Sequence, residues 1–369
     1  MKSIKQPDKR PRKPRITTLG LVAFDYVVDS TNKRLHVQAG GTCGNVAAIL
    51  SALGWQAVPI ARLKEDLIGV QIRADLERFG TDTKWLSCRP DAESPVIVER
   101  ILRDPHGIPF HVFSFLCPGC GGRLPRFQPV TITSLRPILA DAAKADVVFI
   151  DRFSPAAVTL AEAAHGAGSL VYFEPSAAIS SRELERVLQF TNVLKYSHER
   201  IDDAGTAPPE DVFLEIQTLG RGGLRYRRRS RATKRMKDWV HVNPRSVENL
   251  IDSTGAGDWF SAALIHIFAK YGFGAAREMS DLDLLEALSK AQALAAWSCG
   301  FVGARGAMYQ VPLENIERVL VAAKSHIPTQ YGPVYMADGS MATICEICAS
   351  SRRDEEWLRR SDHPKQPTA

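Results

Sequence analysis

The sequence predicts an α/β protein with a three-layer α/β/α core, a separate small β hairpin and a C-terminal extension. Strand-like and helix-like segments alternate between residues 147 and 219, which is typical of a mainly parallel sheet with helices on both faces. Two β-rich runs within residues 94–116 flank a strong turn sequence, which predicts a separate hairpin. Beyond about residue 325 the hydrophobic periodicity is lost, which indicates an appended extension.

The N-terminal third begins with a basic segment. Residues 2–15 carry seven basic side chains, one acidic side chain and three prolines, a composition that favours a flexible, solvated tail over residues 1–15. The apolar run Ile16–Val28 predicts one buried strand and not a signal peptide, because Asp25 interrupts it and no small-residue cleavage site follows. Helices are expected at 45–53 and 67–79, each ending at a glycine.

The remaining elements follow in chain order. The hairpin strands are expected at 96–102 and 108–115, on either side of the turn Asp104-Pro105-His106-Gly107. Apolar runs bounded by turn residues predict further strands, at 147–150, 170–173, 192–194 and 213–219. Helical spacing of apolar residues predicts further helices, at 156–165, 182–188, 259–271 and 284–298.

The composition is that of a globular protein, with 45% hydrophobic and 24% charged residues. No apolar stretch approaches the roughly 18 residues of a membrane span, so we expect a cytoplasmic protein with no membrane partner. Eight of the basic residues lie in a second run at 225–237, without an acidic residue. This run and the basic tail are either solvated surfaces or nucleic-acid contacts, and the scarcity of aromatic residues there favours solvated surfaces.

The segment Asp252-Ser253-Thr254-Gly255-Ala256-Gly257-Asp258 precedes an amphipathic helix. Glycines let the backbone approach a ligand closely, and the free N–H groups of a helix start bind anions. A transferring phosphoryl group requires such a site, and Asp258 at its edge is placed to accept a proton from an attacking hydroxyl. A glycine turn that merely caps a helix remains the alternative interpretation.

A second glycine-rich segment, Gly40-Gly41-Thr42-Cys43-Gly44-Asn45, opens the first predicted helix. The backbone at Gly40 and Gly41 is able to approach a polyol, and the Asn45 amide offers both a donor and an acceptor to hydroxyl groups. Asp25, placed at the end of the first predicted strand, is able to accept hydrogen bonds from neighbouring hydroxyls. Ligands of such sheets bind at the carboxyl ends of the strands.

These two segments resemble the two signatures of the PfkB carbohydrate kinase family, which has the ribokinase-like fold. GGTCGNVAAILSALG resembles the first and DSTGAGDWFSAAL the second, in the same order along the chain. The resemblance spans roughly residues 16–325, and it implies lid strands at about 27–39 and 94–116, with the extension at 326–369. It implies that Asp258 is the catalytic base, that Gly255, Ala256 and Gly257 form the anion hole, and that Asp25, Gly40, Gly41 and Asn45 bind the substrate.

The resemblance also implies how the nucleotide is bound. Asp252 and Thr254 would lie beside it, and the strand and turn with Thr218, Gly220, Gly222 and Gly223 would hold it against the small-residue helix at 291–299. The implied cofactors are ATP, Mg²⁺ and a monovalent cation. The implied reaction is phosphorylation of a hydroxyl on a sugar or sugar-like molecule, and a homodimer formed through the lid is a further implication.

Two segments depart from the family pattern. The family's Asn-x-x-Glu motif is replaced by Lys195-Tyr196-Ser197-His198-Glu199, in which Glu199 is the remaining candidate for a water-mediated role. Glu174 stands where an aspartate is commoner, and it either serves the metal region or ends a strand as a solvated side chain.

A nucleoside kinase of the same fold is an alternative function. A catalytically idle zinc protein that binds nucleic acid is an alternative from another class.

Four of the seven cysteines form two pairs with matched spacing, Cys117/Cys120 and Cys345/Cys348. The segment Cys117-Pro118-Gly119-Cys120-Gly121-Gly122 resembles a zinc knuckle. The two pairs together predict one structural Zn²⁺ that joins the extension to the lid. Two unrelated thiol pairs are the main alternative, and a redox dithiol is less favoured because the first pair follows a hairpin and not a βαβ unit.

Overall fold

The computed structural model describes residues 12–89, 91–201, 208–247 and 249–322, together with Cys345 and Cys348. Most of the predicted tail at 1–15 and of the predicted extension at 326–369 lies outside these residues, so the boundaries of both stay predictions. None of the described helices is long and apolar enough to cross a membrane.

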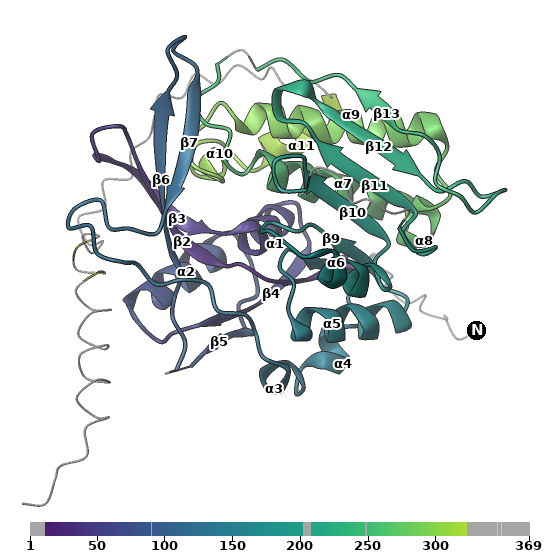
Figure 1. Ribbon diagram of the computed structural model, residues 1–369, viewed down its shortest axis with the longest axis horizontal. Helices are drawn as coiled ribbons and strands as arrows, with labels where there is room; N and C mark the ends of the chain where they lie inside the picture. Colours follow the sequence, from purple (N-terminus) through teal and green to yellow (C-terminus); the bar gives the residue numbers. More distant parts are fainter. Residues whose placement is uncertain are drawn as a thin grey trace, which may run out of the picture.

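The larger sheet of the described chain has nine strands in the order β13-β12-β11-β10-β9-β8-β1-β4-β5 (Figure 1). From β5 to β11 all neighbouring strands are parallel, whereas β12 and β13 are antiparallel additions at one edge. The strands are β1 (Arg15–Leu19), β4 (Gln56–Leu63), β5 (Leu86–Cys88), β8 (Val147–Ile150), β9 (Leu170–Phe173), β10 (Val193–Ser197), β11 (Leu214–Thr218), β12 (Leu224–Arg228) and β13 (Val240–Val242).

Helices cover both faces of this sheet, which gives the three layers expected from the sequence. Along β8 successive buried side chains alternate between two hydrophobic clusters: Val147 and Phe149 join one, and Val148 and Ile150 join the other. The first cluster is completed by α1 (Thr42–Ala52), α2 (Leu67–Arg78), α7 (Ala256–Tyr271), α8 (Phe273–Ala276), α9 (Asp281–Ser298), α10 (Gly306–Gln310) and α11 (Glu314–Ala322). The second is completed by α3 (Ile132–Leu135), α4 (Leu139–Ala142), α5 (Pro155–Gly166) and α6 (Ser181–Leu188).

Local sequence explains where several helices begin. Ser154 caps α5 by accepting a hydrogen bond from Ala157 N–H, and proline occupies the first helical position. Ser180 and Glu183 form a reciprocal capping box at the start of α6. Each such cap stabilises a helix by about 1 kcal/mol, so these starts are fixed by local residues and not by packing alone.

The smaller sheet has the order β3-β2-β6-β7 and stands beside the larger one (Figure 1). It is formed by β2 (Ala23–Val28), β3 (Arg34–Gly40), β6 (Val96–Arg103) and β7 (Pro109–Ser114). The hairpin expected within 94–116 is therefore present as β6 and β7, which pair antiparallel. β2 joins the two halves of this lid, because it pairs antiparallel with β3 and parallel with β6.

The prediction of one strand over Ile16–Val28 is wrong. The run is divided at Gly20, where the chain leaves β1 in the larger sheet and enters β2 in the lid. A Cβ added to Gly20 would lie 1.4 Å from Oδ1 of Asp151, so only glycine allows the backbone to pass this buried carboxylate. Asp25 consequently lies within β2, not at the end of the first strand as predicted.

Candidate active site

Several strands of the larger sheet end at one edge, and polar side chains follow them there. Asp151 follows β8 directly, Glu174 follows β9, and Thr218 ends β11. The N-terminal ends of α1 and α7 contribute to the same place, since the Asn45 side chain of α1 contacts Asp258 of α7. Because parallel strands place their carboxyl ends together, the fold collects these groups from distant parts of the chain.

The start of α7 has the geometry expected of an anion site. Gly255 precedes the helix in the left-handed conformation, with φ of 76°. A Cβ at this position would approach the carbonyl oxygen of Ala304 to 2.5 Å, so the close turn requires glycine. The helix begins at Ala256, and Gly257 and Asp258 follow in its first turn, at the positive end of the helix dipole. The backbone N–H of Asp258 donates to Gly255 across 2.8 Å, and that of Ala256 donates to Ser253 across 3.3 Å.

Asp258 is buried, with 8% of its surface exposed. Its Oδ2 atom accepts a hydrogen bond of 2.7 Å from the side-chain amide of Asn45. Burial raises the pKa of Asp258 to about 6, and the nearby Glu174 raises it further, while Asn45 and Lys195 oppose the change. A carboxylate with this pKa is ionised at neutral pH and is basic enough to take a proton from a reacting group.

Glu174 is not solvated, so that part of its interpretation is wrong. It is buried and forms an ion pair with Lys195, and the hydroxyl of Ser261 donates to its second oxygen. Lys195 also donates to the carbonyl oxygen of Gly257 across 3.1 Å. The lysine therefore places a positive charge directly beside the glycine turn, in the segment where the family's Asn-x-x-Glu motif is missing.

Asp25 and Gly40 lie against each other across β2 and β3. A Cβ added to Gly40 would lie 1.8 Å from Oδ2 of Asp25, which explains why glycine occupies this position. Gly41 caps α1 with φ of 78°, and its Cβ would approach the carbonyl oxygen of Leu21 to 2.4 Å. Burial raises the pKa of Asp25 to about 7, although Arg305 lowers it in part and Asp258 raises it. Asp25, Gly40, Gly41 and Asn45 are thus brought into one place, as predicted.

Arg305 connects this group and was not predicted. Its side chain is fully buried, and its Nε atom donates to Oδ1 of Asn45 across 3.1 Å and to the carbonyl oxygen of Ala39 across 3.2 Å. It also forms an ion pair with Asp75 of α2. Nothing in the local sequence marks this arginine, because its partners come from three separate elements, β3, α1 and α2.

The loop before α7 is held by its own carboxylate and by the lid. Asp252 accepts hydrogen bonds from the backbone N–H of Thr254, at 2.9 Å, and of Gly303, at 2.8 Å. The hydroxyl of Thr254 donates to Glu99 of β6, which is fully buried. His111 of β7 lies 3.8 Å from Asp252. The lid therefore contacts the loop of the second signature, a contact that the sequence analysis missed at Glu99.

The predicted nucleotide turn lies at the end of β11. Residues 220–222 form a 3₁₀ turn, and Gly223 has φ of 87° with its Cβ position 2.3 Å from the carbonyl oxygen of Val242. The carbonyl oxygen of Thr218 accepts a hydrogen bond of 3.0 Å from the backbone of His198, which joins this turn to the end of β10. Gly220 and Gly222 are exposed there, so the turn faces outward at the same edge of the sheet.

Asp151 is a second buried carboxylate that the sequence analysis missed. Its Oδ1 accepts from the backbone N–H of Leu21 and its Oδ2 from the hydroxyl of Ser176, each at 2.9 Å. Burial raises its pKa to about 7. The available signal was its position: an acidic residue directly follows the apolar run 147–150, at the carboxyl end of a strand.

Comparison with known proteins agrees with this geometry. Residues 216–310, which include the glycine turn, Asp258 and Arg305, match the model of the pfkB family carbohydrate kinases. Over these residues the chain resembles the PfkB carbohydrate kinases, as the two sequence signatures predicted. An ATP-dependent ribose-1-phosphate kinase of Halopiger xanaduensis is 27% identical over 274 residues, which cover 73% of this chain and 82% of that protein.

Solved structures show the same fold over most of the chain. The fructokinase of Xylella fastidiosa with bound ATP has a TM-score of 0.63 at 18% identity, and the similarity covers 84% of this chain and 99% of that one. Ribokinase of Arabidopsis thaliana, complexed with ribose and ATP, has a TM-score of 0.59 at 17% identity and covers 84% and 99%. These similarities establish the ribokinase-like fold.

The basic run at 225–237 is partly built into the folded domain. Arg227 forms an ion pair of 2.7 Å with the buried Glu215, and Arg225 donates to Gln217 across 2.6 Å. Both guanidinium groups also stack over Trp239. Arg228 is buried and donates to the carbonyl oxygen of Met279 across 2.7 Å. The expectation of a solvated surface is therefore wrong for these arginines, whose partners hold β12 to the rest of the domain.

The four paired cysteines lie together, apart from the residues around Asp258. Cys117 and Cys345 have sulfur atoms 3.8 Å apart, and the sulfurs of Cys120 and Cys348 are 3.5 Å apart. The first two cysteines follow the lid strand β7, and the other two come from the C-terminal segment. The predicted association of the two pairs is thus present in the structure.

Proposed function

We propose that this protein is a kinase of the PfkB type, which transfers the γ-phosphate of ATP to a hydroxyl group of a sugar or sugar-like molecule. The observation that carries the proposal is Asp258, a buried carboxylate with a pKa of about 6 in the first turn of α7. It lies beside a glycine turn that binds anions and is hydrogen-bonded to Asn45 of the opposite signature. The names of the relatives, which include sugar kinases with bound ATP, support the same reaction.

In the proposed mechanism Asp258 accepts the proton of the acceptor hydroxyl. The hydroxyl oxygen then forms a bond to the γ-phosphorus, and the bond between that phosphorus and the bridging oxygen of ADP breaks. Asn45 donates to one Asp258 oxygen and so orients the other toward the hydroxyl. A positioned general base of this kind contributes about 10²–10⁴ in rate.

The negative charge of the transferring phosphoryl group meets donors at the start of α7. The backbone at Gly255, Ala256 and Gly257 forms the proposed anion hole, with the positive end of the helix dipole behind it. Lys195 adds a cation, since its ammonium group contacts the carbonyl of Gly257. We assign to Lys195 part of the stabilisation of the phosphoryl group's negative charge, a role that the family's Asn-x-x-Glu motif would otherwise support.

The acceptor is assigned to the lid side of the site. Asp25, Gly40, Gly41 and Asn45 provide one carboxylate, one amide and a stretch of backbone without side chains, which suits a molecule with several hydroxyl groups. Arg305 is a positioning residue in this proposal, because it holds Asn45 and the Ala39 carbonyl from behind.

The nucleotide is assigned to the opposite side. Thr218 and the turn with the exposed Gly220 and Gly222 and the buried Gly223 would contact it. Asp252 and Thr254 shape the loop that leads to the anion hole. The end of α9 is the proposed wall of the adenine pocket, since the backbone N–H groups of Ile251 and Asp252 both bond to the carbonyl oxygen of Cys299.

Magnesium usually takes oxygen ligands from one or two carboxylates and from substrate phosphates. Of the carboxylates around the glycine turn, Glu174 is already held by Lys195 and Ser261, and Asp258 is the proposed base. These residues do not fit a protein-held magnesium site, and we propose that Mg²⁺ arrives with ATP and is bound chiefly by its phosphates. Glu199 in a water-mediated role, a monovalent cation and a cytoplasmic location stay predictions.

A dimer formed through the lid stays part of the proposal. It is supported by exposed apolar residues on and just after β7: Phe110, Val112, Phe113, Phe115 and Leu116. Sedimentation of the purified chain tests it. A second species of twice the mass is expected, and a single monomeric species at all concentrations would contradict it.

The experiment that tests the function is an ATP-consumption screen over ribose, ribose 1-phosphate, fructose, ketogluconate and adenosine. Ribose 1-phosphate is included because of the relative from Halopiger xanaduensis. Turnover with one of the sugars supports the proposal, and turnover with adenosine alone would favour a nucleoside kinase. A salt-dependent gel shift without any ATP turnover would favour the nucleic-acid-binding alternative.

A further inference from the structure

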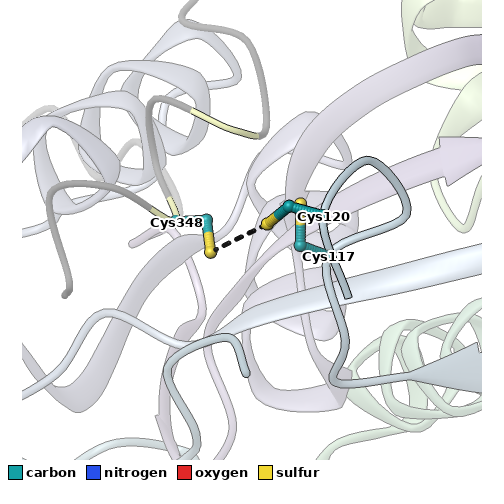
Figure 2. A group of neighbouring side chains, drawn as sticks. All are labelled: Cys117, Cys120 and Cys348. Atoms are coloured by element: carbon teal, nitrogen blue, oxygen red, sulfur yellow. Dashed lines mark hydrogen bonds between the residues drawn. The ribbon is translucent and has the colours of Figure 1, made fainter. Parts of the chain in front are cut away.

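The cluster of Cys117, Cys120, Cys345 and Cys348 plays no part in the proposed phosphate transfer. Figure 2 shows Cys117 and Cys120 on one loop, with Cys348 facing them from the C-terminal segment. The sulfur atoms of Cys117, Cys120 and Cys348 all lie within 4.8 Å of one another, and Cys345 joins them through its 3.8 Å approach to Cys117. Four sulfurs from two distant parts of the chain therefore share one small volume.

The spacing of these sulfurs is that of a metal site and not of disulfide bonds. Zinc–thiolate bonds are about 2.3 Å long, so the sulfurs of a tetrahedral four-cysteine site lie about 3.8 Å apart. The two cross-segment distances are 3.8 Å and 3.5 Å. A disulfide requires about 2.05 Å, so the two cross-segment pairs are not bonded.

The loop that carries the first pair is shaped around the sulfurs. The backbone N–H of Cys117 donates to Gly122 and that of Gly121 to Cys117, each at 2.8 Å, which closes a tight turn. A Cβ added to Gly119 would lie 2.7 Å from the Cys345 sulfur, so glycine is needed to admit the second segment. Gly121 adopts φ of 70°, which also favours glycine.

Burial separates the four cysteines into an inner and an outer pair. Cys117 and Cys348 are 2% and 1% exposed and belong to the main hydrophobic cluster, whereas Cys120 and Cys345 are exposed. The inner pair anchors both segments to the core, and the outer pair leaves a path from solvent by which an ion enters. Two unrelated thiol pairs would have no reason to be placed sulfur against sulfur.

We propose that Cys117, Cys120, Cys345 and Cys348 bind one structural Zn²⁺, which fastens the C-terminal segment to the end of lid strand β7. Four protein thiolates fill the tetrahedral coordination sphere, so the metal has no open position for substrate or water. Binding requires the thiolate forms, and the four thiols release their protons as the metal enters. The site is structural and lies outside the phosphate-transfer machinery.

Metal analysis of the purified full-length chain is the first test. After expression with ample zinc and extensive dialysis, about one zinc per chain is expected. Less than half an equivalent would overturn the proposal. One equivalent of iron in place of zinc would overturn the identity of the metal, because iron also accepts four thiolates.

Variants locate the metal. Cys348→Ser and Gly119→Ala are both expected to lose at least half of the bound zinc, the second while keeping all four cysteines. Cys299→Ser is the matched control, because Cys299 lies at the end of α9 and its sulfur donates to the carbonyl oxygen of Ala295, a bond that serine retains. Zinc loss in Cys299→Ser equal to that in Cys348→Ser would place the metal elsewhere and contradict the proposal.

A thiol count on the wild-type chain keeps the test independent of whether the variants fold. Alkylation under non-reducing, denaturing conditions with a chelator is expected to modify all seven cysteines. Release of one zinc should accompany titration of the native protein with a mercurial reagent. Modification of only three cysteines, with no zinc released, would show that the cluster forms two disulfides and would refute the zinc site.

Discussion

The Glu174→Gln substitution tests the electrostatics of the candidate base. Burial is the largest cause of the raised pKa of Asp258, and the neighbouring Glu174 carboxylate is the second. Glutamine keeps the shape and is still able to accept a hydrogen bond from Ser261. The substitution removes one negative charge beside Asp258 and leaves the Lys195 ammonium without its partner, and both changes favour the ionised form of Asp258.

The expected size follows from the pKa values. The pKa of Asp258 is raised from 3.8 to about 6, and we expect the loss of Glu174 to lower it by roughly one unit, a part of that displacement. A base with a pKa near 6 is ionised in about a tenth of the molecules at pH 5, whereas a pKa near 5 raises this to about a half. The fraction of the pH 8 activity that remains at pH 5 should therefore be roughly five times larger in the variant than in the wild type.

The assay is the pH dependence of kcat/KM for the acceptor found in the screen, measured from pH 4.5 to 8.5. The acidic limb of the Glu174→Gln profile should move to lower pH. Glu185→Gln is the control, since it makes the same chemical change at an exposed position of α6 and should leave the limb in place. An unchanged limb in Glu174→Gln, or one that moves to higher pH, would refute the assignment of that limb to Asp258.

Three further substitutions test other parts of the site. Gly40→Ala should displace Asp25 and raise the acceptor KM at least tenfold, because the added methyl group would lie 1.8 Å from that carboxylate. Gly166→Ala is the control and should leave the acceptor KM unchanged, because the space around Gly166 is open. Similar kinetics for the two variants would disprove the contact. Asp25→Ala should weaken acceptor use and leave ATP affinity nearly unchanged in calorimetric titration, so lost ATP binding would refute its placement. Asp151→Asn should raise stability at pH 8. Because the pKa of Asp151 is raised to about 7, the contribution of this carboxyl group to stability is fully present below pH 3.8 and is lost as the pH rises through 7. The asparagine variant should therefore gain up to about 4 kcal/mol over wild type at pH 8 and little at pH 4. Denaturant unfolding at both pH values checks this, and an equal gain at both would contradict it.

The sequence predicted the elements whose signals are local. Gly255, Gly40 and Gly41 are each required by a close approach of their backbone to neighbouring atoms, so the two glycine-rich segments marked the starts of α7 and α1. The strands at 147–150 and 170–173 agree with the structure residue for residue, because both are fully buried apolar runs with turn residues around them. The two cysteine pairs were associated correctly because their matched spacing is itself a signal.

What the sequence missed depends on contacts between distant segments. Arg305 is buried through partners on β3, α1 and α2, and Glu99 through its contact with Thr254, which no local pattern announces. The division of residues 16–28 into two strands was missed because the buried carboxylate that requires glycine at position 20 comes from the end of β8. The basic run was judged by its composition, whereas its arginines find carboxylate, carbonyl and aromatic partners only in the folded sheet.

The most direct test of the central claim is the turnover of Asp258→Asn with ATP and the acceptor found in the screen. Asparagine keeps the shape and the bond from Asn45 but accepts no proton, so kcat should fall by about 10²–10⁴. Nucleotide affinity should stay near that of wild type, because the backbone donors of the glycine turn are unchanged. Asp238→Asn, at an exposed position, should behave as wild type. Turnover by Asp258→Asn within a factor of a few of wild type would show that Asp258 is not the base.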